Sequence, residues 1–321
     1  MKIKEIQDLF IEEGINEDLR GKDAVLADLA ERKKKYDSLS AEKKEYYDMD
    51  SLINPYSDSK ILYGNPDAEV KTVIVGIDME IGEVLLTKQL INFGKKIDLI
   101  IAHHPDGCAY SNFHEVIKIQ SGIVSKLGVP VNVAEKLIEG RVREVRRSVL
   151  PENIERTSDA AKLLQIPFMT AHTVADNHVA SFLQREIDAL KPLRIKDIMD
   201  YLYTLQEYRD SAKKGLAPTT FFGSEDSLCG RVFVDMTGGT EGPVEMFERL
   251  SAAGVGTVVS MHLGQKAVKE AEKYHINVLI AGHISSDNLG LNLLFDKLEK
   301  KHGKLDFVEA SGFRRFRRTA E

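Results

Sequence analysis

The feature that most constrains this chain is a series of three short apolar runs that occurs twice along it. The first series comprises residues 70–78, 97–102 and 166–171. The second comprises residues 230–236, 255–261 and 276–281. Short runs rich in Val, Ile and Leu are typical of strands that are buried on both faces. The repetition predicts two related halves, each built on its own sheet.

Helical patterns separate the runs within each series, for example at 82–96, 242–254 and 266–275. Strands that alternate with helices form βαβ units, in which neighbouring strands are parallel. The sequence therefore predicts an α/β fold with two mostly parallel sheets. Because ligands of such sheets bind beyond the carboxyl ends of the strands, the two halves are expected to face a shared cleft.

The chain is expected to contain four regions. Residues 1–66 are highly charged and lack strand-like alternation, so they form a helical N-terminal extension. Residues 67–180 form the first half, and residues 181–228 form a helical insert or linker. Residues 229–321 form the second half, which ends in a basic tail. A further helical insert is expected near 130–157.

Composition excludes several classes of protein. The formal net charge of -6 argues against a nucleic-acid binder, whose domain is usually basic. The apolar runs are shorter than the roughly 20 residues that a membrane span needs. Two distant cysteines and a charged N-terminus indicate neither a disulfide framework nor a signal peptide, so a cytoplasmic location is expected.

The runs end in side chains that bind metals. Asp78 and Asp235 end the first run of each series, and the second runs lead to His103 with His104 and to His262. Both third runs lead to a His-x-x-x-Asp motif, His172 with Asp176 and His283 with Asp287. A histidine and an aspartate four residues apart lie one helical turn from each other, so both can reach one ion.

Imidazole and carboxylate ligands without thiolates suit Zn, Fe, Mn, Co or Ni in an open site. Neighbouring side chains of a strand point to opposite faces. We therefore expect His103 and His104 to diverge toward two different ions, or toward one ion and a residue behind it. Two divalent ions can generate a nucleophile at neutral pH and stabilise a hydrolytic transition state.

Other motifs leave alternatives open. The loop 237–242 contains Thr237, Gly238 and Gly239 between a strand and a helix, which suits either an anion site or a tight turn. The basic stretches 141–147 and 313–318 are interpreted as solvated charge or subunit contacts. Cys108 is interpreted as a small apolar residue rather than a ligand.

With these motifs in view, the chain resembles the NIF3-like family, also described as GTP cyclohydrolase I type 2 homologues or dinuclear metal centre proteins. The first half carries "SKILYGNPDAEVKTVIVGID" and "DLIIAHHP", which are similar to the opening signature of the family. "AHTVAD" resembles its His-Thr-x-x-Asp motif, and "AGHISSD" resembles its late Gly-His motif. The last residue of that late motif is Asp287, where the family usually has Glu.

The resemblance implies a NIF3-like fold, a hexameric ring and two metal ions per chain. The implied metal ligands are His103, His104, Asp176, His283 and Asp287, with Asp176 and Asp287 as bridges. His172 is implied as a proton shuttle or substrate contact. The residues expected around the site, either supporting the ligands or binding the substrate, are Asp78, His178, Thr237, Gly238, Gly239 and His262.

Three functions remain in consideration. The first is a metal-dependent hydrolase, in which a metal-bound hydroxide attacks a nucleotide or heterocycle in a GTP cyclohydrolase-like reaction. The second is a non-catalytic metal-binding ring that acts as a scaffold, metal carrier or regulator. The third is a phosphoesterase. Fold alone does not decide among them.

Overall fold

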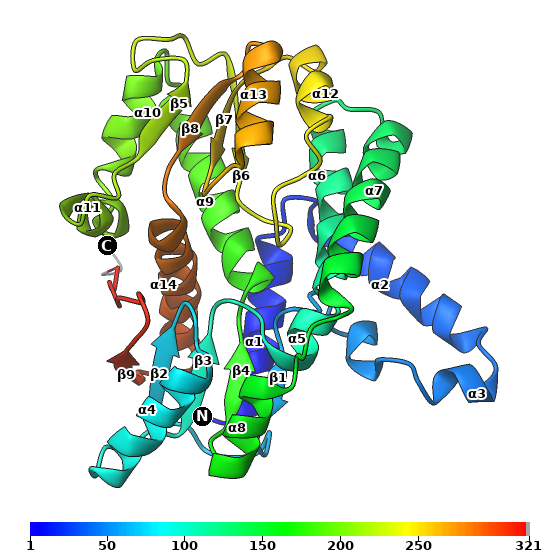
Figure 1. Ribbon diagram of the computed structural model, residues 1–321, viewed down its shortest axis with the longest axis vertical. Coiled ribbons are helices and arrows are strands. Elements are labelled where there is room, and N and C mark those ends of the chain that lie inside the picture. The colour runs from blue at the N-terminus through cyan, green and yellow to red at the C-terminus, as the bar shows by residue number, and fades with distance from the viewer. Residues whose placement is uncertain (319–321) are drawn as a thin grey trace.

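The computed structural model describes residues 1–318 and contains two β-sheets at opposite ends of the long axis (Figure 1). In spatial order the first sheet consists of β1 (Ile61–Tyr63), β4 (Phe168–Thr170), β3 (Leu99–Ala102), β2 (Thr72–Gly76) and β9 (Asp306–Glu309). The second consists of β5 (Thr219–Phe222), β8 (Asn277–Ile280), β7 (Val255–Ser260) and β6 (Arg231–Asp235).

The two sheets share one plan. In each, three parallel strands follow the same order, and a short antiparallel strand, β1 or β5, pairs with the last of them. All six predicted runs form these parallel strands. The α/β fold and the internal repetition are thus confirmed.

Alternate residues of the first sheet enter two separate cores. Ile74 and Ile100 face α4 (Ile81–Asn92) and α8 (Arg156–Leu164), where they pack against residues such as Val84. Val73 and Leu99 face the opposite side, among residues of α1, α9 and α14. These helices are α1 (Ile3–Asn16), α9 (Thr173–Leu190) and α14 (His283–His302). Apolar side chains on both faces explain why β2 and β3 are continuous apolar runs.

The second sheet is also covered on both faces. One face packs against α6 (Ile119–Lys126), α7 (Val131–Val149), α12 (Met246–Ala252) and α13 (Gln265–Lys273). The other packs against α9, α10 (Ile195–Leu202) and α11 (Gln206–Lys213). The predicted insert near 130–157 therefore contains α7, which buries Ala134, Ile138, Val145 and Val149 along one face.

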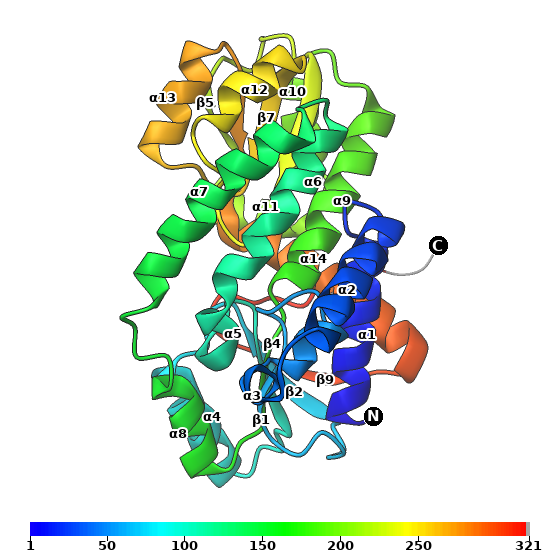
Figure 2. The same cartoon turned by 90° about the vertical axis from the view of Figure 1, so that its right-hand side faces the viewer.

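Helices α9 and α14 connect the two sheets. Helix α9 leaves the end of β4 toward the second sheet, and α14 leaves the end of β8 toward the first, so the carboxyl ends of both sheets face the centre (Figures 1 and 2). The two helices touch closely at Gly290 of α14. A Cβ atom added there would lie only 2.4 Å from the carbonyl oxygen of Ala175 on α9. This contact holds the two helix N-termini, and the side chains they carry, in one place.

Short strands occur in three regions where the sequence does not predict them. β1 belongs to the range expected to be a helical extension, β5 to the expected helical insert, and β9 to the end of the second half. β9 pairs with β2, so the end of the chain returns to the first sheet. Edge strands of three or four residues carry too little periodicity to be recognised in sequence.

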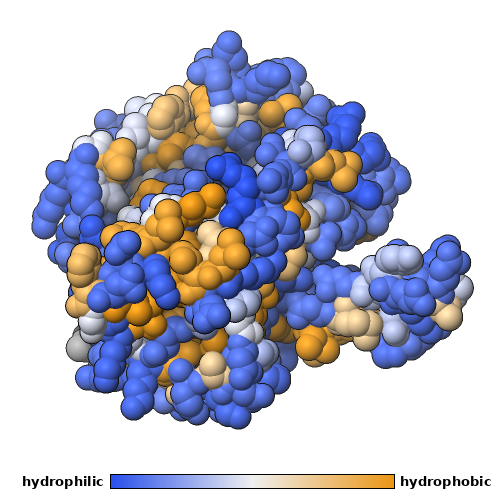
Figure 3. Space-filling view, turned by 60° about the horizontal axis from the view of Figure 1, so that its bottom comes forward, coloured by the Kyte–Doolittle hydropathy of each residue, from blue (hydrophilic) through white to orange (hydrophobic). Residues whose placement is uncertain are grey.

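The N-terminal region has two parts. Helix α1 packs into the first core through Ile3, Ile6 and Phe10. In contrast, α2 (Lys22–Asp37) buries only Val25, and with α3 (Ala41–Lys44) it projects from the body as an arm (Figure 3). No helix within residues 1–318 is both long enough and apolar enough to cross a membrane.

The basic tail corrects one interpretation from sequence. The sequence predicts solvated or intersubunit charge at Arg315, but its side chain is only 3% exposed. Its guanidinium lies 2.5 Å from Asp296 and 2.8 Å from Glu299, both on α14. A buried arginine requires such partners, since an unpaired buried charge is costly. The tail therefore fastens along α14, while residues 319–321 lie outside the described chain.

Candidate metal centre

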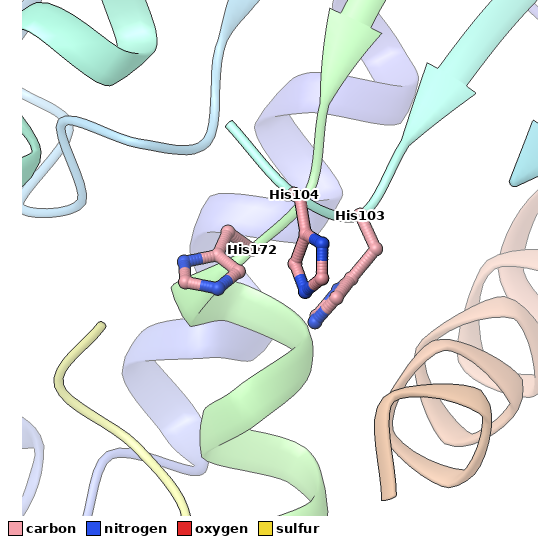
Figure 4. A group of neighbouring side chains, drawn as sticks. All are labelled: His103, His104 and His172. Carbon is pink, nitrogen blue, oxygen red and sulfur yellow. The ribbon is translucent and has the colours of Figure 1, made fainter. Parts of the chain in front are cut away.

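The five predicted metal ligands meet at the centre of the molecule, from three segments. His103 and His104 follow β3, Asp176 lies in the first turn of α9, and His283 and Asp287 lie in the first two turns of α14. The rings of His103 and His104 also lie beside that of His172, at the start of α9 (Figure 4). The strand ends of both halves thus contribute to one site.

His103 directs one ring nitrogen at two carboxylates. Its Nδ1 lies 3.0 Å from the carbonyl oxygen of Ala171, so Nδ1 carries the proton and donates it. Its Nε2 then lies 3.4 Å from Oδ1 of Asp176 and 3.4 Å from Oδ1 of Asp287. The lone pair of Nε2 therefore points between two carboxylate oxygens. A cation bound at this position would stabilise all three atoms.

His104 and His283 approach the other oxygen of the same carboxylate. The Nε2 atoms of His104 and His283 each lie 3.6 Å from Oδ2 of Asp287. The Nδ1 atom of His104 lies 2.7 Å from Oδ1 of the exposed Asp78, which fixes the ring orientation. Asp287 therefore lies between two groups of potential ligands.

The expected divergence of His103 and His104 is wrong in its geometry. The two ring centroids lie only 5.2 Å apart, and both rings face Asp287. β3 ends at Ala102, so the alternation of a strand no longer governs these side chains. They nevertheless face different oxygens of Asp287.

His172 is oriented by a carboxylate that sequence reasoning missed. Its Nδ1 lies 2.8 Å from Oδ2 of Asp58, and its Nε2 lies 3.7 Å from Oδ2 of Asp176. Asp58 is fully buried and also accepts a hydrogen bond from Thr173. Asp58 lies just before β1, in the region expected to be a helical extension. The one signal in the sequence that could have identified it is its place directly before the "SKILYG" motif.

The polar atoms at the centre fit a cation. Within residues 1–318, Nε2 of His103, Oδ1 of Asp176 and both carboxylate oxygens of Asp287 are buried without a hydrogen-bond partner. Buried polar groups in folded proteins are almost always paired. Three groups of ligand atoms each lie within 4.8 Å of one another: His103, Asp176 and Asp287; His104, His283 and Asp287; and the three histidines of Figure 4. These buried His and Asp side chains can therefore bind metal ions.

Electrostatics in the metal-free protein reflect the same crowding. Burial lowers the pKa of His103, but the carboxylates of Asp287 and Asp176 outweigh it and raise that pKa well above its ordinary value. Burial, together with the charges of His103 and His172, lowers the pKa of His104 to about 4. Burial opposes ionisation of Asp287, yet His103 and the other histidines lower its pKa to about 2. The two carboxylates thus stabilise positive charge beside His103, where a metal ion fits.

A pocket of about 410 Å³ adjoins the ligands, including solvent-open space. Thr237 and Gly239 line it, as does His262, whose ring contacts that of His283 at 4.7 Å. Thr237 donates a hydrogen bond to Asn177 on α9. The structure thus places Thr237, Gly239 and His262 beside the predicted ligands.

The glycine-rich loop 237–242 forms a tight turn held by the first half of the chain. Gly238 and Gly239 both have positive φ angles, of 95° and 81°. Nε2 of Gln120 on α6 donates to the carbonyls of Gly238 and Thr240, at 3.3 Å and 2.6 Å. Arg141 on α7 donates to Thr240 and to the carbonyl of Glu241. Arg141, from the first basic stretch, thus fixes one wall of the pocket.

His178, although predicted to lie around the site, does not line the pocket. It is buried on α9, where its Nδ1 donates to the carbonyl of Val174 at 2.6 Å. Burial, followed by the charge of Lys297, lowers its pKa to about 4. It lies two residues beyond Asp176 and therefore on a different face of the helix.

Comparisons with known proteins identify similar structures. No protein-family model and no curated protein matches the chain. A NIF3 superfamily protein from Sphaerobacter thermophilus is 29% identical, with a TM-score of 0.69, over 80% of this chain and 92% of that one. Reduced HcgD from Methanocaldococcus jannaschii is 15% identical, with a TM-score of 0.47, over 84% and 94%. A Bacillus cereus protein related to NIF3 is 11% identical, with a TM-score of 0.41, over 79% and 91%.

Proposed function

The chain is a NIF3-like protein, and on this premise we propose that it binds two divalent transition-metal ions and acts as a hydrolase. One ion would be held by His103, Asp176 and Asp287. The other would be held by His104, His283 and Asp287. The observation that carries the proposal is the unpaired, buried state of both carboxylate oxygens of Asp287, each facing a different histidine.

Asp287 suits the bridging position despite its short side chain. Each of its oxygens already lies 3.4 to 3.6 Å from a histidine nitrogen, which leaves room for a cation between them at ordinary metal–ligand distances of about 2.0–2.2 Å. Oxygen and nitrogen ligands without sulfur suit Zn, Fe, Mn, Co or Ni.

Bound divalent ions would make a water molecule more acidic and would stabilise negative charge on the substrate. The chain itself supplies proton transfer. His172 holds a proton at Nδ1 through Asp58 and turns Nε2 toward Asp176. Burial lowers the pKa of His172, but Asp176 and Asp58 outweigh it and raise that pKa, which suits a group that accepts and returns a proton.

The substrate is proposed to be a small molecule whose hydrolysed bond lies in a heterocycle, an amide or a phosphoester, with nucleotides such as GTP as first candidates. A non-catalytic metal carrier or scaffold is the competing proposal.

The free thiols of Cys108 and Cys229 suit a reducing cytoplasm.

The test combines metal analysis with a hydrolase screen. Reconstituted protein should contain about two ions per chain, and His104→Ala should lose at least one while remaining folded. His275→Asn is the matched control, because His275 is exposed and belongs to none of the three ligand groups. Fewer than about 0.3 ions per chain would refute the metal centre. Two ions per chain without turnover of GTP, amides or phosphoesters would favour the carrier or scaffold.

We further propose that the chain forms a homo-oligomer, the hexameric ring that the resemblance implies. Beside the projecting arm, the side chain of Tyr46 is 85% exposed and that of Ile53 is 68% exposed. Exposed apolar side chains on a projecting segment are typical of subunit contacts. Sedimentation velocity measures the assembly, and a monomer at micromolar concentration would refute it.

A further inference from the structure

We propose that Asp235 is a second proton-transfer group of this centre, a carboxylic acid that protonates the departing nitrogen of an amide or a ring C–N bond. The inference rests on the proposed hydrolytic function and names its substrate class. It goes beyond the implied role of His172, because Asp235 comes from the other half of the chain, at the end of β6, and lines the same pocket as His172.

The internal repetition explains why Asp235 is available. In the first half, Asp78 follows β2 and is engaged by His104 at 2.7 Å. Asp235 ends β6, the strand that corresponds to β2 in the second sheet. Within residues 1–318, no hydrogen bond or ion pair engages the Asp235 carboxylate. The strand-end histidine of the second half, His262, contacts His283 through its ring instead.

Asp235 lies where an apolar cavity meets the metal pocket. On one side, Phe233 and Met246 line a small cavity within the second core. On the other side, Asp235 lines the pocket of the metal ligands. A carboxyl group between apolar residues and a narrow cleft loses the hydration that stabilises its charge.

The charged groups around Asp235 reinforce this effect. Glu241, from the loop 237–242, carries a negative charge that disfavours a second one on Asp235. The other titratable groups on the same pocket are His172, Asp176, His262, His283 and Asp287. Burial first, and Glu241 second, raise the pKa of Asp235 to about 7. A carboxylic acid that keeps its proton near neutral pH can act as a general acid.

The reaction assigned to Asp235 balances without a further reagent. The oxygen of water forms a bond to the carbon while the carbon–nitrogen bond breaks. The electron pair of the broken bond stays on the nitrogen, which binds the proton donated by Asp235. The Asp235 carboxylate then regains a proton from those released by the attacking water. An amine departs poorly unless it is protonated, whereas a nitrophenolate needs no acid. The presence of this acid therefore favours C–N bonds over activated esters.

The test compares Asp235→Asn with the unchanged protein, both loaded with metal, on an acyl p-nitroanilide and a p-nitrophenyl ester that share one acyl group. We expect the substitution to slow anilide cleavage at least 100-fold and ester cleavage less than about threefold, consistent with the usual contribution of a general acid. Both proteins should contain the same amount of metal. Asp200→Asn, on an exposed position of α10, is the control and should change neither rate.

A second readout needs no turnover. Infrared difference spectra of the metal-free protein should show a protonated carboxyl band that disappears with a midpoint near pH 7 and is absent from Asp235→Asn. Equal slowing of both substrates, or no such band, would overturn the inference alone. Metal-loaded unchanged protein that cleaves neither these substrates nor the wider panel would instead overturn the proposed hydrolase, and the inference with it.

Discussion

Gly290 provides a direct test of how the fold positions the centre. Its Cα lies against the backbone of α9, and an added Cβ would lie 2.4 Å from the carbonyl oxygen of Ala175. Ordinary contact begins at 3.4 Å, so Gly290→Ala requires α14 and α9 to separate by about 1 Å. Because Asp176 follows Ala175 and Asp287 lies one turn before Gly290, the separation would also displace both carboxylates.

The expected magnitude combines two opposing effects. Replacing Gly by Ala within a helix stabilises it by about 1 kcal/mol. Overpacking against a backbone atom costs about 1–3 kcal/mol, and the rigid carbonyl of Ala175 favours the upper half of that range. We expect Gly290→Ala to lower the free energy of unfolding by about 1–2 kcal/mol. Displaced ligands should also weaken metal binding, by about tenfold or more.

Gly140→Ala is the matched control, because Gly140 lies within α7 and an added Cβ meets nothing within 4 Å. It should raise the free energy of unfolding by about 0.5–1 kcal/mol and leave the metal affinity unchanged. Urea titrations of the metal-free proteins and competition with a chelator measure the two quantities. If both variants are equally stable and bind metal equally, the close approach of α9 and α14 does not position the site.

Two further predictions concern hydrogen-bonded carboxylates. Asp58→Asn should lower the pKa of His172, because the Asp58 carboxylate helps to raise it; an NMR titration of the metal-free protein measures this, and an unchanged pKa would contradict the assigned contact. Glu17→Gln should destabilise the fold by about 1–2 kcal/mol at pH 7: burial opposes ionisation of Glu17, but Arg185, Lys297 and Ser181 lower its pKa to about 2. Since the folded-state pKa is depressed, the difference in free energy of unfolding between the two proteins has its full value above about pH 4.5 and should shrink as the pH falls toward 2. Urea titrations measure it, and a difference that does not change with pH would indicate lost packing instead.

The sequence predicts much of this centre because apolar runs and strand ends are local signals. The β2, β3, β4, β6, β7 and β8 strands were all predicted, and so was the convergence of His103, Asp176 and Asp287. Parallel strands bring their carboxyl ends together, so residues that are distant in sequence must meet. That inference needs only the order of the elements.

The features that sequence did not predict depend on contacts between distant segments. Asp58 is recognisable as part of the candidate site only once His172 lies beside it. The common direction of His103 and His104 depends on where β3 ends, and element ends are the least predictable part of a sequence pattern. The buried state of Arg315 depends on two carboxylates of α14, which no local pattern connects with the tail.

The pairing of β9 with β2 has a consequence for how the molecule forms. During synthesis, the first sheet cannot gain its last strand until the second half and α14 have left the ribosome. Contacts between segments so distant in sequence slow folding, because a long loop must close before they are made. The two halves are therefore not independent folding units. An isolated first half would expose the edge of β2, where another strand can pair and cause aggregation.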